Sequence, residues 1–206
     1  MFAPKTTASP TTALTGFVRS PTIVITRRLV SLSGEAVRLM HHRQAPVHHC
    51  ACLSRFGSCW FELKGFLARY LSSLGHEVVD VGPDVFDVGD DYPPSCIETA
   101  SRVVADPGSM GEVIGGLGNG EQISANKVAG CRAVPAWSTE TARLAREHND
   151  AQVLGVGARM HGPARAAEIV EAFLATSFSG GERHARRIRL IADFEVTADA
   201  PPMSAD

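Results

Sequence analysis

The sequence predicts an α/β protein whose central sheet is mainly parallel and covered by helices on both faces. Short β-rich runs alternate with segments in which apolar residues recur at helical spacing, over residues 61–194. The short runs are apolar at nearly every position, which is typical of strands buried on both faces. Strands that alternate with helices favour crossover connections and therefore parallel pairing. A chain of 206 residues, 44% of them hydrophobic, can bury such a core.

The first predicted helix covers Phe61–Leu74, where apolar residues share one face, and Gly75 ends it. The predicted strands are Glu77–Val81, Glu112–Gly115, Ala133–Trp137 and Val153–Val156. The other predicted helices are Pro93–Ala105, Gln122–Lys127, Thr139–Glu147 (with Ser138 or Thr139 as N-cap), Pro163–Ala175 and Glu182–Phe194. These elements predict a Rossmann-like three-layer sandwich, in which ligands bind beyond the carboxyl ends of the strands.

Residues 1–60 differ in character from the rest. They hold seven of the 20 Lys/Arg residues but only one of the 22 acids, Glu35. The predicted organisation is a poorly ordered basic extension over 1–55, a folded α/β domain over 56–196 and a flexible tail over 197–206. Ile23–Ile25 has strand character, but a long loop would have to connect it to the domain.

Three other interpretations of the first 60 residues stay open. One is an N-terminus replaced through a frameshift or a mispredicted gene start. Another is an organelle transit peptide, because the segment is basic and poor in acids. The third is a metal cluster, although its spacing matches no common zinc site. That cluster would draw on His41, His42, His48, His49, Cys50, Cys52 and Cys59.

A glycine-rich loop is the most informative stretch of the chain. Residues 113–127 read VIGGLGNGEQISANK, so an apolar run enters a loop with four glycines and leaves it as a helix. Glycine lets the backbone approach a ligand closely, and a helix start offers N–H groups to a phosphate or an enediolate oxygen. Glu121 at the mouth of this loop is a candidate general base. The plainer interpretation is a tight turn with an exposed glutamate.

This loop resembles the active-site loop of the ribose-5-phosphate isomerase B family, in the branch that carries Gly-Asn-Gly-Glu-Gln-Ile-x-Ala-Asn-Lys. In other members a cysteine near the loop start is the base; that position looks like Gly116 here, which leaves Glu121 as the base. Further segments resemble family motifs in order and spacing, and the resemblance covers roughly residues 61–196. They are Asp-Asp-Tyr-Pro (90–93), Ala-Arg-Glu-His-Asn-Asp-Ala-Gln (145–152), Gly-Ala-Arg-Met (157–160) and Arg-His-Ala-Arg-Arg (183–187).

The resemblance implies an aldose–ketose isomerase that interconverts ribose 5-phosphate and ribulose 5-phosphate through an enediolate, with no metal or other cofactor. It also implies a homodimer in which the last helix reaches the partner's site. Glu121 would be the base and His148 would assist ring opening. The substrate would contact Tyr92, the loop residues Gly116, Leu117, Gly118, Asn119 and Gly120, then Asn149, and the phosphate-binding Arg159, Arg183 and Arg187.

Each of these side chains also has a structural interpretation. His148 can stabilise a helix end through the dipole, and Asn149 can cap that helix. The three arginines can form a solvated basic face, and Tyr92 can simply pack.

Two features depart from the family pattern, the residue at 117 and the turn before Phe61. Leu117 stands where a serine or threonine is usual, and loss of such a donor costs about 2.7–4 kcal/mol of transition-state stabilisation. Gly57 and Ser58 stand where the family has Asp and His. The alternatives are therefore an isomerase of six-carbon (allose or galactose) 6-phosphates, or an inactive sugar-phosphate-binding homologue. A nucleotide-binding role is weaker, because no fitting acidic residue follows the next strand.

The expected location is the cytoplasm. Five irregularly spaced cysteines without a clear secretory signal favour reduced thiols. No apolar run approaches the ~18–20 residues of a membrane helix. We expect a sugar phosphate and a second copy of the chain as partners, and no nucleic acid or membrane.

Overall fold

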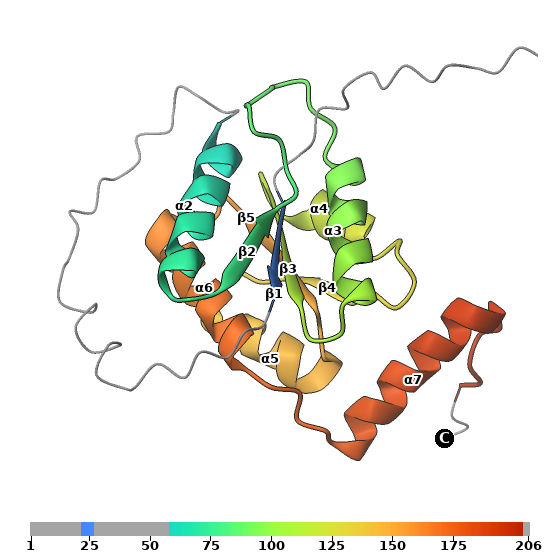
Figure 1. Ribbon diagram of the computed structural model, residues 1–206. Helices are drawn as coiled ribbons and strands as arrows, with labels where there is room; N and C mark the ends of the chain where they lie inside the picture. Colours follow the sequence, from blue (N-terminus) through green and yellow to red (C-terminus); the bar gives the residue numbers. More distant parts are fainter. Residues whose placement is uncertain (1–21, 27–57, 204–206) are drawn as a thin grey trace, which may run out of the picture.

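A central sheet with helices on both faces forms the body of the protein (Figure 1). The computed structural model describes residues 22–26 and 58–203. The strands are β1 (Thr22–Thr26), β2 (Glu77–Asp80), β3 (Met110–Gly115), β4 (Ala133–Pro135) and β5 (Val153–Gly157). The helices are α2 (Cys59–Ser73), α3 (Pro93–Ala105), α4 (Asn119–Ala125), α5 (Thr139–Asn149), α6 (Pro163–Ala175) and α7 (Glu182–Thr197). The predicted α/β sandwich is confirmed.

The strand order is β2-β1-β3-β5-β4. β5 pairs in parallel with both β3 and β4. β1 pairs antiparallel with β2 on one side and with β3 on the other, so it alone runs against the common direction of the other four strands. The sheet is therefore mainly parallel, as predicted, with one reversed strand beside its centre.

That reversed strand corrects a prediction. Thr22–Thr26 was expected to lie in an extension outside the domain, yet Ile23, Val24 and Ile25 are buried within the sheet. The gain from burying three β-branched apolar residues outweighs the cost of a long connection, because closure entropy grows only slowly with loop length. The rest of the predicted extension, and its His/Cys cluster apart from Cys59, lies outside the described residues.

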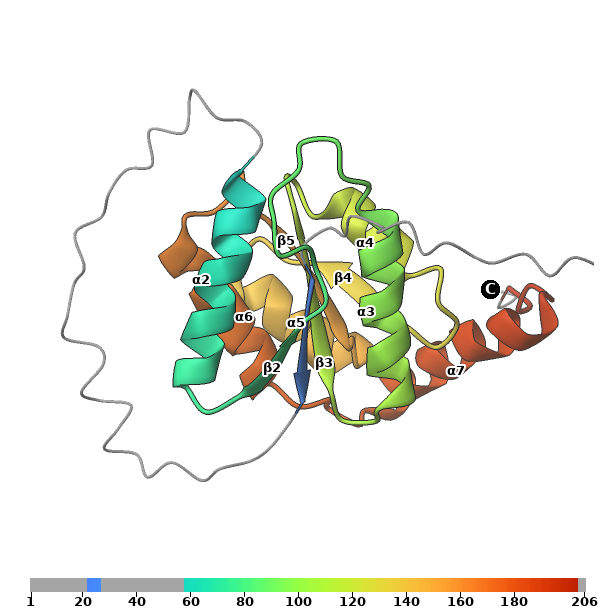
Figure 2. The same ribbon diagram turned by 45° about the horizontal axis from the view of Figure 1, so that its top comes forward.

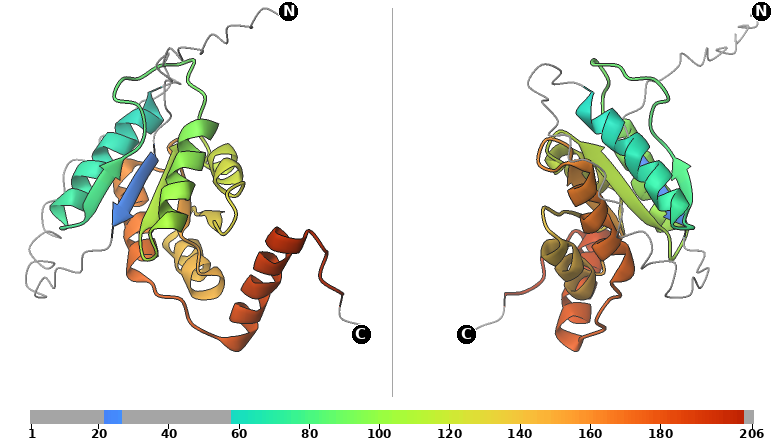
Figure 3. Two further views of the ribbon diagram at one scale, coloured as in Figure 1. Left: turned by 45° about the vertical axis from the view of Figure 1, so that its right-hand side comes forward. Right: turned by 90° about the vertical axis from the view of Figure 1, so that its left-hand side faces the viewer.

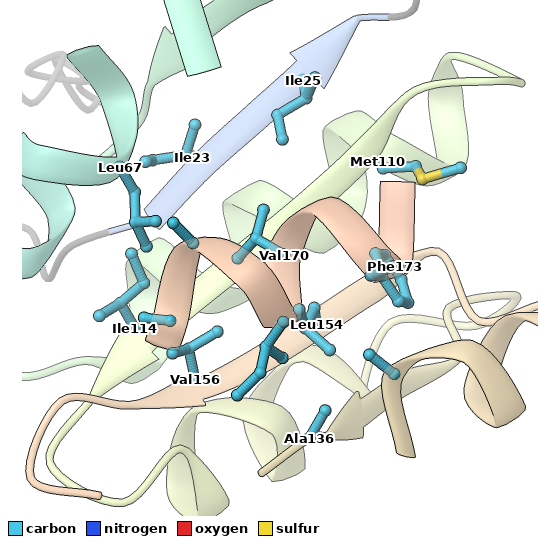
Figure 4. Close-up of a cluster of buried hydrophobic side chains, with 14 of the residues drawn as sticks. Ile23, Ile25, Leu67, Met110, Ile114, Ala136, Leu154, Val156, Val170 and Phe173 are labelled. Carbon is cyan, nitrogen blue, oxygen red and sulfur yellow. The ribbon is translucent and has the colours of Figure 1, made fainter. Parts of the chain in front are cut away.

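Two apolar clusters hold the layers together. One packs α2, α5 and α6 against one face of the sheet, and the other packs α3 and α4 against the opposite face (Figure 2). Because successive side chains of a strand point to opposite faces, Ile23 and Ile25 enter the first cluster and Val24 the second. Figure 4 shows the first cluster, where strand residues meet Leu67 of α2 and Phe173 of α6.

Helix α7 stands apart from this body. It extends away from the sandwich (Figures 1 and 3), and none of its residues is buried. Its exposed apolar residues include Leu190, Ile191 and Phe194. Within residues 22–26 and 58–203, no helix combines the length and the apolar character that crossing a membrane requires.

Candidate active site

The glycine-rich loop lies at the carboxyl edge of the sheet, between the end of β3 and the start of α4. Gly118 has a φ of 82°, in the left-handed region that favours glycine. A Cβ on Gly118 would also lie 3.2 Å from backbone atoms of Gly155 and Val156, so the loop crosses β5 at close range. The turn after β5 is bonded to the same loop: Ala158 N–H donates to the Gly115 carbonyl (2.8 Å) and Arg159 N–H to the Gly116 carbonyl (3.1 Å).

Two consecutive glycines make room for the side chains of the predicted base and of a predicted phosphate-binding arginine. Glu121, in the first turn of α4 and only 9% exposed, folds back over Gly115. A Cβ on Gly115 would lie 1.6 Å from Glu121 Oε1, whereas one on Gly116 would lie 3.3 Å from Cζ of Arg159. Adjacent Cα atoms are about 3.8 Å apart, so the carboxylate and the guanidinium flank neighbouring backbone positions.

This geometry corrects a detail of the sequence interpretation. The cysteine position of other family members was expected at Gly116. The volume that the Glu121 carboxylate fills is instead the one that a side chain at position 115 would occupy. Gly116 faces Arg159.

Tyr92 joins the same group from the start of α3. A Cβ on Gly120 would lie 2.6 Å from the Tyr92 hydroxyl oxygen, so this ring packs directly on the loop. β1 ties down the neighbouring backbone: the Thr22 hydroxyl donates to the Ser95 carbonyl (3.4 Å) in the first turn of α3. The structure thus brings together Glu121, Tyr92, Arg159 and the loop residues.

A buried thiol lies close to this group but is a poor candidate for the base. Burial, together with the nearby Glu121 and Asp90, raises the pKa of the Cys96 thiol well above its ordinary value. A thiolate is therefore disfavoured beside Glu121 at neutral pH. The carboxylate is the better candidate for removing a proton.

The side chains of Leu117 and Met160 stand at the rim of the site, 55% and 58% exposed. The Leu117 backbone and the Met160 side chain both approach Gly157, where a Cβ would lie 2.8 Å from the Leu117 carbonyl oxygen and 2.9 Å from Met160 Cγ. The residue that replaces the family's Ser or Thr is therefore at the solvent-facing edge of the loop.

The other predicted residues lie at the opposite edge of the sheet. α5 runs back from the end of β4, so His148 and Asn149 come just before the amino end of β5. Strand β5 has five residues, which at ~3.3 Å each put about 16 Å between the two edges. Arg183 and Arg187 lie in the first part of α7, the helix whose His184 contacts His148. Within one chain, these four residues do not meet the Glu121 group.

A residue that the sequence interpretation missed lies in this second group. The imidazole rings of His148 and His184 stack, with centroids 4.3 Å apart and an interplanar angle of 5°. The signal was present, since His184 belongs to the Arg-His-Ala-Arg-Arg segment, but only the arginines were given a role.

Comparison with known proteins identifies the family. Residues 58–191 match a family described as Ribose/Galactose Isomerase. The ribose-5-phosphate isomerase B of Mycobacterium leprae is 55% identical over 143 residues, which cover 69% of this chain and 88% of that protein. The chain belongs to the ribose-5-phosphate isomerase B family. The Mycobacterium tuberculosis protein of the same name is 54% identical over the same length and with the same coverage.

Solved structures agree with this assignment. Ribose-5-phosphate isomerase B from Mycoplasma genitalium, with bound ribulose-5-phosphate, superposes with a TM-score of 0.65 at 37% identity, covering 68% of this chain and 93% of that one. The Thermotoga maritima enzyme gives a TM-score of 0.63 at 37% identity, with coverage of 66% and 93%. Members of this family are aldose–ketose isomerases.

Proposed function

We propose that this chain interconverts ribose 5-phosphate and ribulose 5-phosphate, a reaction of the pentose phosphate pathway. One observation carries the proposal: the Glu121 carboxylate is folded over Gly115, inside a glycine-rich loop at the ligand-binding edge of the sheet. The names of the relatives, and the ribulose-5-phosphate bound to the Mycoplasma genitalium protein, support this substrate.

In the proposed reaction Glu121 removes the proton from C2 of the open-chain aldose and returns it to C1. The carbonyl moves from C1 to C2 as a proton passes from O2 to O1, so the reaction needs no net oxidant. Backbone N–H groups of Gly118, Asn119 and Gly120 are the proposed donors to the enediolate oxygens. The low exposure of Glu121 limits exchange of the transferred proton with water.

The remaining side chains open the ring and hold the substrate. His148 transfers the proton that ring opening requires, because imidazole can donate or accept near pH 7. Arg159, Arg183 and Arg187 bind the phosphate, for which a guanidinium offers paired donors in a fixed geometry. Tyr92 and Asn149 contact the sugar hydroxyls.

The complete site is proposed to form only in a homodimer. The Glu121 group and the His148 group lie at opposite edges of the sheet, so one chain cannot bring them together. Arg183, Arg187, Ile191 and Phe194 fall on one face of α7, which has no buried residue of its own. This face can cover the carboxyl edge of a second copy and carry the arginines to its loop. A two-fold axis would then create two equivalent sites.

The catalytic domain is proposed to comprise residues 56–196, with Thr22–Thr26 completing the sheet. The cytoplasm is the proposed location, because it holds the pentose phosphates and keeps cysteines reduced.

The decisive experiment is formation of ribulose 5-phosphate by the purified parent beside Glu121→Gln. We expect turnover in the parent and a loss of about 10²–10⁴-fold in the variant, the usual contribution of a general base. Glu98→Gln is the matched control, because Glu98 is exposed and pairs with Arg102 on the surface of α3 (2.8 Å). A folded, dimeric parent without turnover would contradict the proposal. If allose 6-phosphate is turned over faster than ribose 5-phosphate, the six-carbon compound is the better substrate and the proposed substrate is wrong.

A further inference from the structure

Two hydrogen bonds from the connecting segment hold the junction between α5 and α7 in place. Ser179, in the segment that connects α6 to α7, donates twice to the Glu147 carbonyl, from its N–H (3.1 Å) and from its hydroxyl (2.6 Å). Glu147 immediately precedes His148, so this anchor places the start of α7 beside His148. One carbonyl in the last turn of α5 thus holds the segment that leads into α7.

The two histidines meet at this junction. The His184 ring lies flat on the His148 ring, with centroids 4.3 Å apart. Gly181 leaves room for it, since a Cβ there would lie 3.2 Å from Cδ2 of His184. Both rings are half-buried. The stack contacts the His148 ring directly, and the two Ser179 bonds fix the backbone one residue before it.

We propose that His184 is a positioning residue for ring opening: it holds the His148 imidazole in one plane and couples it to the two phosphate-binding arginines of the same helix. The inference rests on the proposed function, because it assigns His184 a role through His148. His184 itself need not touch the reacting atoms. A substrate phosphate bound by Arg183 and Arg187 would lie within one helical turn of the stacked pair.

Electrostatics agree with this role. Partial burial, followed by the neighbouring His148, Arg183 and Arg187, lowers the pKa of His184. This shift favours the neutral form of His184, which suits the stack because two imidazolium rings at this separation repel. The charged or titratable groups around the pair are Glu147 and His148 on α5 and Glu182, Arg183 and Arg187 on α7. A bound phosphate would offset the arginine charges and favour the protonated form of His184 when substrate arrives.

The test compares His184→Ala with His184→Phe in the full-length protein. The alanine removes the stack, whereas phenylalanine keeps a flat ring without a titrating nitrogen. We expect His184→Ala to lower kcat for ribose 5-phosphate about tenfold with little change in KM. His184→Phe should keep most of kcat but alter the acid limb of the pH–rate profile. His76→Ala, a half-buried histidine between α2 and β2, is the control and should leave both parameters unchanged.

A second measurement separates this inference from the proposed function. NMR of the His148 ring protons, without substrate, should show resonances displaced in His184→Ala, because the ring current of the stacked neighbour is lost, and close to the parental positions in His184→Phe. Unchanged His148 ring resonances in His184→Ala, or a parental kcat and pH profile in a folded His184→Ala, would overturn the inference. If the parent lacks turnover, the proposed function fails, and the resonances still decide whether His184 stacks on His148 in solution.

Discussion

The two edges of the sheet carry functional side chains under different physical conditions. At the carboxyl edge, Glu121 is nearly buried and sits in space that a missing side chain at Gly115 leaves free. At the amino edge, Arg183 and Arg187 are exposed on a helix that leaves the body of the protein. The first group is organised within one chain, whereas the proposed role of the second requires another copy of the chain. Mutations should therefore act through local geometry at one edge and through assembly at the other.

The largest expected effect comes from Gly115→Ala. The new methyl group would overlap Glu121 Oε1, 1.6 Å away, and must displace the carboxylate from the loop. We expect kcat to fall about 10²–10⁴-fold, as on loss of the base itself. Steady-state kinetics on ribose 5-phosphate is the measurement. Gly65→Ala in α2, whose nearest neighbour is the end of a flexible arginine side chain (3.3 Å), should retain full activity. Parental kcat in Gly115→Ala would mean that Glu121 is not the base in this position.

The second prediction concerns assembly. Phe194→Asp places a charge on the apolar face of α7, where Phe194 is 48% exposed in the single chain. We expect a monomer by sedimentation and a loss of activity of about 100-fold or more, since desolvating a carboxylate at an interface is costly. The free energy of unfolding of the monomer should change little, because α7 buries none of its residues. An active, monomeric Phe194→Asp would show that each chain holds a complete site.

The third prediction concerns Glu112, on the strand that joins the two edges. Its side chain is fully buried, and neither carboxylate oxygen has a hydrogen-bond partner. Burial raises its pKa from 4.5 to about 8. The folded state therefore holds a proton that the unfolded state releases above pH 4.5. The contribution of Glu112 to the free energy of unfolding should be highest at and below that pH and fall by about 1.4 kcal/mol per unit until pH 8, where it levels off.

Urea unfolding at several pH values checks this prediction. Glu112→Leu should remove this part of the pH dependence and be more stable than the parent at pH 8, because it replaces an unpartnered polar group by an apolar one. Glu98→Leu, at an exposed site on α3, should keep the parental slope. Parallel curves for the parent and Glu112→Leu would mean that Glu112 stays ionised in the folded protein.

The smallest expected effect sharpens the contrast between neighbouring glycines. In Gly116→Ala the new methyl group meets the Arg159 guanidinium at 3.3 Å, so this flexible side chain has to move by only a few tenths of an ångström. We expect KM to rise a few-fold while kcat stays close to the parental value. Direct comparison with Gly115→Ala under the same assay provides the measurement. Equal losses of kcat in both variants would indicate a general disturbance of the loop.

Local signals in the sequence predicted most of the elements. Ser138 was one of two expected N-caps of α5, and its hydroxyl accepts the Thr141 N–H at 3.1 Å in a capping box. The glycine-rich loop was expected between a strand and a helix, and it lies between β3 and α4. Such features depend on residues a few positions apart, so periodicity, caps and glycines reveal them.

The long-range features escaped prediction. Thr22–Thr26 pairs with strands that begin more than 50 and 80 residues later, and it does so in the reverse direction. A five-residue run does not indicate which strands it will pair with or whether the pairing will be parallel or antiparallel. The sequence also offered no sign that His148 and Glu121 lie far apart in one chain. Whether two residues share a site depends on which edge of the sheet their segments reach.

The sequence alone therefore determined the α/β class, the glycine-rich loop, the candidate base Glu121 and the family resemblance, all of which depend on short-range patterns. Only the tertiary structure decided that a buried β1 completes the sheet, that the carboxylate of Glu121 fills the space over Gly115, and that His184 stacks on His148. These contacts join residues that are close in space and mostly distant along the chain. Their energies arise from packing, burial and strand pairing, which no local pattern of residues encodes.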